Sequence, residues 1–427
     1  MENQGARVYG YRWVVLAVFA LITALIEVQW LTFAPIAREA REVYQVTAFQ
    51  VDLLSLVFMA VFLVVCLPAS YIIDTLGIRV GIGLGAFLTG AFSLLKAFCV
   101  DDYQMVMVAQ VGLAVAQPFI LNAATKVAGQ WFPLNERAIA VGIATLAQFV
   151  GIIVVMIVTP LLITRGAGGV MELGPVMNLY GGGAAAGAVL TLLLLREKPP
   201  TPPEGEESDT RTSFKEGVSL IFRNRDMQKV LLLFFIGLGM FNAVSTCIDQ
   251  ICQVKGLSVE QTGLVGGMML IAGIVGALIL PVLSDKLRKR KIFMIIAMAG
   301  MAPGLAGLTF FTDYTLLLIS SFIFGFFLLG AGAPVGFQYS AEITWPAPES
   351  ASQGIILLTG QISGILFIVV MNNIGMSLSM AILFGLSLLT IVLGCLMKES
   401  PLILVDGQVV SKKVRDDASP ASEAIPG

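Results

Sequence analysis

Long apolar runs, separated by short polar stretches, dominate the hydrophobic pattern of this chain. Val14 to Ala34 is one such run, and Leu53 to Ile73 is the next. Crossing about 30 Å of hydrocarbon takes roughly 20 helical residues. In lipid every backbone amide needs an internal partner, so these runs are predicted to be membrane-spanning helices rather than the alternating strands of a membrane barrel. The predicted helices are 12–34, 51–73, 80–100, 104–130, 138–163, 174–195, 228–251, 260–284, 292–311, 314–340, 351–373 and 375–397.

Three segments are too polar to cross the membrane. The central one opens with a Pro- and Glu-rich sequence, and its second part, Phe214 to Phe222, has the amphipathic spacing of a helix that lies along a membrane surface. The polar C-terminal tail has the composition of a disordered segment. The predicted organisation is an N-terminal six-helix bundle over 1–195, whose first residues 1–12 are polar, a cytoplasmic linker over 196–227, a C-terminal six-helix bundle over 228–397 and a disordered cytoplasmic tail over 398–427.

The composition agrees with this pattern. Hydrophobic residues make up 57% of the 427 positions and charged residues 13%. Soluble domains carry about 25% charged residues, so most of the outer surface is expected to face lipid. With the N-terminus placed in the cytoplasm, most lysines and arginines fall on cytoplasmic segments, as the positive-inside rule requires. We therefore expect a multi-pass protein of the cell membrane with both termini cytoplasmic. The basic residues assigned to the outer side are Arg38, Arg41, Lys96, Arg165 and Lys255.

The composition does not favour enzymatic or metal chemistry. The chain contains no histidine, the commonest zinc and haem ligand. Its five cysteines form no CxxC pair, and most lie within apolar runs, where buried thiols are typical. We expect no enzyme activity, no cofactor, no metal site and no nucleic acid partner. The expected partners are a small organic solute and the lipid bilayer, with the protein as a monomer.

An internal repeat divides the chain into two similar halves. Like residues in the predicted helices 4–5 and 10–11 recur at a separation of 213 positions. A duplication of six helices explains this, and such proteins hold their substrate between the halves near the membrane midplane. The predicted fold is an all-α polytopic membrane protein with twelve helices in two pseudo-symmetric bundles. The matched pairs are Pro133/Pro346, Glu136/Glu349, Ala138/Ala351, Gln148/Gln361 and Gly151/Gly364.

A charged turn follows the second helix and reads Asp74-x-x-Gly77-x-Arg79. This motif resembles the loop signature of the major facilitator superfamily, and its counterpart in the second half contains Asp285 and Arg290. The glycine allows a tight turn, and Asp74 would pair with a basic group or a helix N-terminus of the opposite half when the inner side closes. We therefore predict a cytoplasmic gate formed by these five residues.

Narrower motifs recur from helix 1 to helix 11. They are Gln29-Trp30, Val115 to Asn122, Trp131-Phe132, Glu136 to Ala138, Val244 to Thr246, Gln250, Gly325 to Phe327, Gly336-Phe337, Glu342 to Thr344, Pro348 to Ser350 and Gln361 to Phe367. These motifs resemble the feline leukaemia virus subgroup C receptor-related transporters over nearly the whole predicted membrane core. The resemblance implies a secondary transporter of a family associated with choline and ethanolamine, for which haem export has also been proposed.

The resemblance also implies a choline pocket. The family uses a tryptophan of helix 1 and glutamines of helices 4 and 11, and the matching positions are Trp30, Gln117 and Gln361. An indole face attracts a quaternary ammonium by cation–π contact, and glutamine carbonyls accept the substrate hydroxyl. This sequence departs from the family at Asn242, where a tyrosine of the pocket wall is expected, and at Glu27, where an uncharged residue is expected.

Glu27 is the most informative single residue, because it lies one turn before Trp30 on the same helix face. A carboxylate within a membrane helix costs several kcal/mol unless it is partnered, and it is therefore a functional candidate. It would neutralise a cationic substrate or carry a coupling proton; the alternative is a water-exposed residue of the outer vestibule. We expect Asn122 and Asn242 to lie near it in the substrate cavity.

Other polar residues have simpler interpretations. Asp249, at the outer end of helix 7, is expected to be a solvated helix end. Lys126 is expected to extend to the cytoplasmic surface. Gln117 and Gln361 are also explained as packing contacts between helices.

The predicted function is secondary active transport of a small organic solute by alternating access, with a choline-like organic cation as the candidate substrate. Three alternatives remain open: a non-transporting sensor or receptor on the same scaffold, a proton-coupled transporter of an unrelated metabolite, and a membrane enzyme acting on lipid-borne substrates. The sequence contains no carboxylate pair within one helix and no nucleophile motif, so these features do not favour the membrane enzyme.

Overall fold

The computed structural model describes residues 9–165, 171–201, 219, 221–345, 347, 349–400, 404–405 and 408–409. Within these residues, twelve helical stretches are long and apolar enough to cross a membrane, which confirms the predicted number. Most of the predicted surface helix at Phe214 to Phe222 and most of the predicted tail lie outside the described residues.

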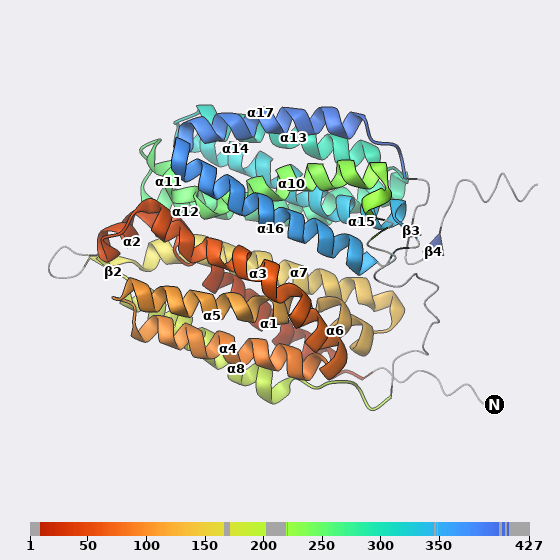
Figure 1. The fold of residues 1–427 in the computed structure, drawn as a ribbon, viewed down its shortest axis with the longest axis horizontal. Coiled ribbons are helices and arrows are strands. Elements are labelled where there is room, and N and C mark those ends of the chain that lie inside the picture. Colours follow the sequence, from red (N-terminus) through yellow and green to blue (C-terminus); the bar gives the residue numbers. More distant parts are fainter. Residues whose placement is uncertain are drawn as a thin grey trace, which may run out of the picture.

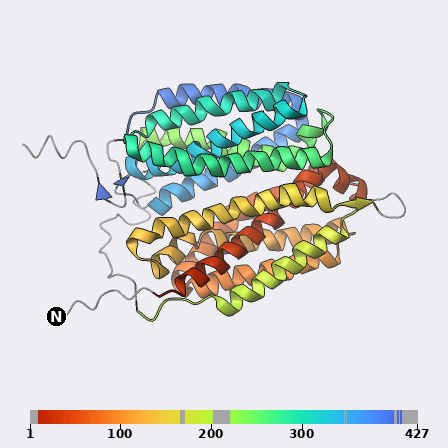
Figure 2. The same ribbon diagram turned by 180° about the vertical axis from the view of Figure 1, so that it is seen from behind.

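The helices form two bundles that lie side by side (Figures 1 and 2). The first bundle contains α1 (Arg12–Trp30), η1 (Ala34–Ile36), α2 (Ala37–Tyr44), α3 (Ala48–Leu76), α4 (Ile78–Phe98), α5 (Tyr103–Leu121), α6 (Ala124–Trp131), α7 (Leu134–Leu162) and α8 (Gly174–Leu194). The second contains α10 (Arg225–Thr246), α11 (Ile248–Gln253), α12 (Val259–Leu287), α13 (Lys291–Phe310), α14 (Tyr314–Phe327), η2 (Leu328–Gly332), α15 (Ala333–Ile343), α16 (Glu349–Ile374) and α17 (Met376–Cys395). Two short ribbons pair β1 (Thr164–Arg165) with β2 (Met171–Glu172) and β3 (Leu404–Val405) with β4 (Gln408–Val409).

Four of the predicted helices are interrupted, and this corrects the sequence-based boundaries. The first ends at Trp30, and η1 with Pro35 at its start leads into α2. The fourth divides at Asn122–Ala123 into α5 and α6, one turn after Pro118. The seventh divides into α10 and α11, and the tenth contains the π-helical turn η2. Such turns occur frequently at functional sites.

Glycines allow close approach of helix backbones within and between the bundles. A Cβ atom at Gly151 of α7 would meet the backbone of Ala24 in α1, so these helices pack without an intervening side chain. Between the bundles, a Cβ atom at Gly263 of α12 would meet the carbonyl of Met156 in α7. Small residues are typical of such contacts in membrane proteins, and the bundles meet along α7 with α12 and α3 with α16.

The internal repeat has a counterpart in the way two equivalent helices begin. At α4, the Glu197 carboxylate accepts hydrogen bonds from the backbone amides of Ile78 (3.1 Å) and Arg79 (2.7 Å). At α13, Glu399 accepts from the amides of Arg290 (2.7 Å) and Lys291 (3.0 Å). In both places a carboxylate satisfies free amides at the positive end of a helix dipole.

The two ends of the helix bundles can be told apart by the helix termini and short helices found there. At one end, here called the linker end, Tyr11 donates to the carbonyl of Leu194 (2.7 Å) and Lys229 donates to that of Leu396 (2.9 Å). These bonds place the start of α1 beside the end of α8, and the start of α10 beside the end of α17. The opposite end, here called the α2 end, carries α2 and α11 (Figure 1). Lys291 begins α13 at the linker end, at the opposite end of the molecule from Arg38.

Candidate functional site

Helix α1 places a buried carboxylate inside the first bundle. The Glu27 residue is 2% exposed, and its Oε1 accepts a hydrogen bond of 3.2 Å from Nε2 of Gln117 in α5. Within the described part of the chain Glu27 has no ion-pair partner. A buried charge without an opposite charge is costly. The structure therefore brings two predicted site residues together, and it does not place Glu27 in an exposed vestibule.

Trp30 is held by two reciprocal hydrogen bonds with α3. Its indole Nε1 donates to the carbonyl of Ser55 (3.2 Å), and the Ser55 hydroxyl donates to the carbonyl of Trp30 (3.1 Å). With its only donor occupied, the indole offers a ligand its ring faces. Those faces carry the negative part of the ring quadrupole. The predicted role of Trp30 as an electron-rich wall is compatible with this geometry.

Asn242 and Gln361 belong to the second bundle, at its contact with α3. The Asn242 side chain donates to the carbonyl of Gly360 (3.2 Å), next to Gln361 in α16. A Cβ atom at Gly364 would lie 2.9 Å both from Asn242 and from Sδ of Met59 in α3. These two residues therefore lie near the interface between the bundles. Their convergence with Glu27 and Trp30 on one cavity stays a prediction, because no described hydrogen bond joins the two groups.

Asn122 lies at the break between α5 and α6. Its amide donates to the carbonyl of Cys66 (3.2 Å) and to the hydroxyl of Ser70 (3.0 Å), both in α3. These bonds connect two helices of the first bundle. In this structure the Asn122 amide is occupied by protein partners.

An ion pair that the sequence did not reveal joins the bundles at the α2 end. The guanidinium of Arg38 contacts Asp249 of α11, with Nη2 2.6 Å and Nε 2.8 Å from Oδ1, while its backbone amide donates to Oδ2 (2.7 Å). Asp249 is fully buried, so the expectation of a solvated helix end was wrong. Burial raises the pKa of Asp249, and the hydrogen bonds and charge of Arg38 oppose that rise.

A second buried carboxylate at the α2 end also bridges the bundles. Asp52 of α3 accepts hydrogen bonds from Nε2 of Gln250 (2.7 and 2.8 Å), from Nδ2 of Asn372 (2.6 Å) and from Sγ of Cys247 (3.4 Å). All of these donors belong to the second bundle. We call the five residues Arg38, Asp52, Asp249, Gln250 and Asn372 the clamp. Gln250 lay within a family-like motif, but nothing in its spacing indicated Asp52 as its partner.

The described contacts of the predicted gate residues at the linker end lie within one bundle. The Asp74 side chain is 74% exposed and lies 3.6 Å from Nζ of Lys126, which belongs to the same bundle. This contact also places Lys126 at the linker end, as predicted. Gly77 adopts a φ of 93°, which allows the tight turn before Arg79.

In the second half, Arg290 is fully buried and pairs with Glu342 (Nη2–Oε1, 3.0 Å), again within one bundle. Asp285 lies in the last turn of α12, but its side chain is outside the described part. Among the described residues, every hydrogen bond between the bundles lies at the α2 end. The protein is therefore closed at the α2 end, whereas at the linker end no hydrogen bond joins described residues of the two bundles.

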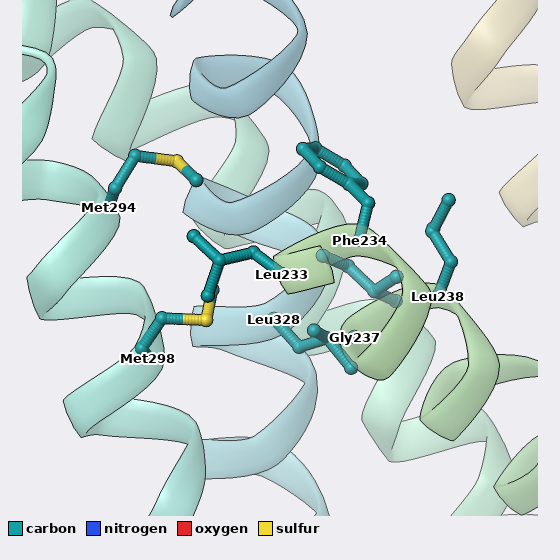
Figure 3. A pocket seen from close by; sticks show the side chains of 8 residues that line it. Leu233, Phe234, Gly237, Leu238, Met294, Met298 and Leu328 are labelled. Carbon is teal, nitrogen blue, oxygen red and sulfur yellow. The ribbon is translucent and has the colours of Figure 1, made fainter. Parts of the chain in front are cut away.

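Two hollows occur in the described structure, one within the second bundle and one beside the clamp. Within the second bundle, a pocket has a wholly hydrocarbon and thioether lining that includes Phe234, Met294 and Met298 (Figure 3), so it offers no group that would orient a polar solute. A recess at the α2 end is lined by Arg38 together with Glu39, Glu42 and Glu260. Because Arg38 is paired with Asp249, the remaining charge of this recess is acidic.

Comparisons with known proteins identify the relatives of this chain. The sequence pattern of the Major Facilitator Superfamily matches residues 19–368 and 253–408. Solute carrier family 49 member A3 of Danio rerio is 30% identical over 378 residues, which cover 86% of this chain and 79% of that protein. The choline/ethanolamine transporter FLVCR2 of Rattus norvegicus is 27% identical over 389 residues, covering 87% of this chain and 71% of that protein.

Solved structures share the fold. A bacterial homologue of the human lysosomal transporter Spinster, in an inward-facing and unoccupied conformation, has a TM-score of 0.73 at 15% identity and covers 91% of this chain and 97% of its own. A D-xylose–proton symporter has a TM-score of 0.69 at 14% identity, with 92% and 99% covered. At these identities the likeness establishes the architecture alone.

Proposed function

The chain belongs to the Major Facilitator Superfamily and is related to the FLVCR transporters, and from that premise we propose that it moves a small organic cation across the membrane by alternating access. The observation that carries the choice of a cation is Glu27. It is a buried carboxylate, hydrogen-bonded to Gln117, and it has no basic partner among the described residues. A bound cation would supply the missing opposite charge.

Two further features favour a cation over an anion. Trp30 lies one turn from Glu27, and its ring is fixed by Ser55, so a cation near Glu27 would meet an aromatic face at little cost in ordering. At the α2 end, the acidic recess beside Arg38 would raise the local concentration of cations. Relatives named as choline/ethanolamine transporters make choline the natural first probe.

The α2 end is closed, and at the linker end no hydrogen bond joins described residues of the two bundles, which corresponds to one state of an alternating-access cycle. The distribution of basic residues favours a cytoplasmic linker end. With that orientation, the structure would represent a state that is shut towards the outside and receives or releases solute on the cytoplasmic side. In the opposite state, the clamp would separate and the predicted gate at Asp74 and Asp285 would close.

Binding of choline to the purified protein tests this proposal. Choline should raise the thermal unfolding temperature, and a titration gives its Kd. Cation–π contact contributes about 2 kcal/mol when desolvated, which is roughly thirtyfold in affinity. Trp30→Ala should therefore weaken choline binding about thirtyfold, and Glu27→Gln should weaken it as well.

Matched controls are available in the same chain. Trp13→Ala and Glu172→Gln alter an exposed tryptophan and an exposed glutamate, and both should bind choline like the parent. If Glu27→Gln and Trp30→Ala also bind like the parent, or if the protein is stabilised by a dicarboxylate such as succinate and not by choline, the cation proposal is wrong. The assignment to a transporter family would stand.

A further inference from the structure

A lysine that the sequence placed at the outer surface lies inside the first bundle. Lys96, in the last turn of α4, has no solvent-exposed surface at all. Its Nζ donates one hydrogen bond, of 3.1 Å, to the hydroxyl of Thr32, and it lies 5.7 Å from the centre of the Phe33 ring. In the described part of the chain it forms no ion pair. Lys96 therefore stands at the α2 end of α4, the end that also carries Arg38, and is buried there.

The surroundings of Lys96 are polar but contain no carboxylate partner for it. Ser93 precedes it by one turn, and its hydroxyl is buried without a hydrogen-bond partner in the described structure. The same holds for the side-chain oxygens of Gln29 and Gln110. Gln110 reaches the carbonyl of Gln29 (3.4 Å), one turn from Thr32, so these groups form one buried polar cluster around the end of α1.

Four titratable groups on the helices packed against α4 have partners other than Lys96. On α1, Glu27 is bonded to Gln117. On α3, Asp52 is bonded to donors of the second bundle. The tyrosines are Tyr103 of α5, which donates to the carbonyl of Gln50 (2.7 Å), and Tyr180 of α8, which is paired with Thr159.

A single buried ammonium without an opposite charge is expensive, whereas a neutral amine of the same shape is not. Burial without an opposite charge therefore favours the neutral amine of Lys96 over the ammonium. Hydration of the site restores the ammonium. The Lys96 side chain is therefore neutral when it is buried and charged when water reaches it.

Thr32 and Phe33, the residues that contact the Lys96 ammonium, belong to the segment that the clamp holds in place. Thr32 and Phe33 lie in the non-helical stretch between α1 and η1, which leads directly into α2. η1 packs against α11 and α12 of the second bundle, and α2 carries Arg38, which is bonded to Asp249. Separation of the bundles at the α2 end would release this segment and admit water to Lys96.

We propose that Lys96 is a proton-binding site coupled to the opening of the α2 end. The amine takes up one proton from water when that end opens and returns one proton to water when it closes; only the N–H bond forms and breaks. This adds a proton to the transport cycle. The inference rests on the proposed alternating access, and it is independent of the identity of the transported solute.

The native cysteines provide the test. Cys247 and Cys252 are buried at the α2 end, whereas Cys395 is exposed at the linker end. In lipid nanodiscs, a maleimide should react with Cys395 at all times and with the two buried thiols only when the α2 end opens. Mass spectrometry gives the ratio of the buried-site rates to that of Cys395, which corrects for much of the pH dependence of thiol chemistry.

Binding of one proton to the open state alone changes the open-to-closed ratio by up to about tenfold per pH unit. In the parent, the labelling ratio should therefore rise as the pH falls from about 9 to 7, where aspartates are ordinarily ionised. Lys96→Met, which is similar in size and uncharged, should remove this dependence. Lys96→Arg, which stays charged, should keep the ratio high and independent of pH. Lys198→Met, a change at an exposed lysine of the linker end, should behave like the parent.

The proposal is overturned if the labelling ratio of the parent is flat between pH 9 and 7, or if that ratio falls as the pH is lowered. It is also overturned if Lys96→Met retains the pH dependence of the parent. If both buried thiols remain unlabelled at every pH, the α2 end does not open, and alternating access fails together with the proton site. If the expected shift is seen but choline does not bind, the proton site stands and the choline-like substrate is wrong.

Discussion

Asp249→Asn removes the charge that holds Arg38 at the α2 end and should open that end. Breaking a buried ion pair by removing one partner costs about 3–5 kcal/mol. The Arg38 side chain is 19% exposed, so part of its charge remains solvated and the lower end of that range applies. A loss of about 3 kcal/mol from the closed state alone shifts the closed-to-open ratio by about a hundredfold, at about 1.4 kcal/mol for each factor of ten.

Spin-label distances measure this shift. Nitroxides at Glu42 of α2 and Gln253 of α11, both exposed, report the separation of the bundles in a background without the five native cysteines. The parent should show mainly a short distance, and Asp249→Asn should show a second, longer one. Arg38→Met should act in the same direction. Combining both changes should cost less than their sum, because each breaks the same contact.

A matched ion pair at the other end serves as the control. Arg12 and Glu136 lie 3.1 Å apart within the first bundle, with partly exposed side chains. Glu136→Gln should leave the distance distribution unchanged. If Asp249→Asn also leaves it unchanged, the Arg38–Asp249 pair does not hold the α2 end closed.

The remaining predictions concern the second carboxylate of the clamp and the packing of the first bundle. Asp52→Asn replaces an acceptor with a group that opposes the N–H donors of Gln250 and Asn372, so the same spin labels should show partial opening, and an unaltered distribution would contradict this. Gly151→Val places carbon atoms against the backbone of Ala24 and should lower the thermal unfolding temperature by several degrees. The control Gly182→Val, where a Cβ atom meets open space, should not; equal losses in both variants would show that this close packing is unimportant.

Much of the fold follows from the sequence because bilayer thickness sets the length of an apolar run. The twelve helices and their duplication were predictable from run lengths and from pairs such as Gln148 and Gln361. The interruptions were not, because Pro118 and the glycines of η2 lie inside runs that remain apolar on both sides of the break. Hydropathy registers the composition of a run and is insensitive to its hydrogen bonding.

Site residues were predictable where a single residue is unusual for its position in an apolar helix. They were not predictable where the role of a residue depends on a contact with a residue far away in the sequence. Glu27 was found because a carboxylate is out of place in an apolar helix. Asp249 was misassigned because its partner, Arg38, lies 211 positions away. Lys96 was counted with the outer residues because it stands near the end of a run, and only the fold shows that Thr32 and Phe33 cover it.

The central claim, alternating-access transport of an organic cation, is tested most directly by choline counterflow in proteoliposomes. Vesicles loaded with unlabelled choline should accumulate labelled choline transiently through the parent protein. Glu27→Gln should be strongly impaired, while Glu172→Gln should match the parent. If the parent shows no more counterflow than vesicles without protein, or if Glu27→Gln equals the parent, the account of this site as a cation carrier is contradicted.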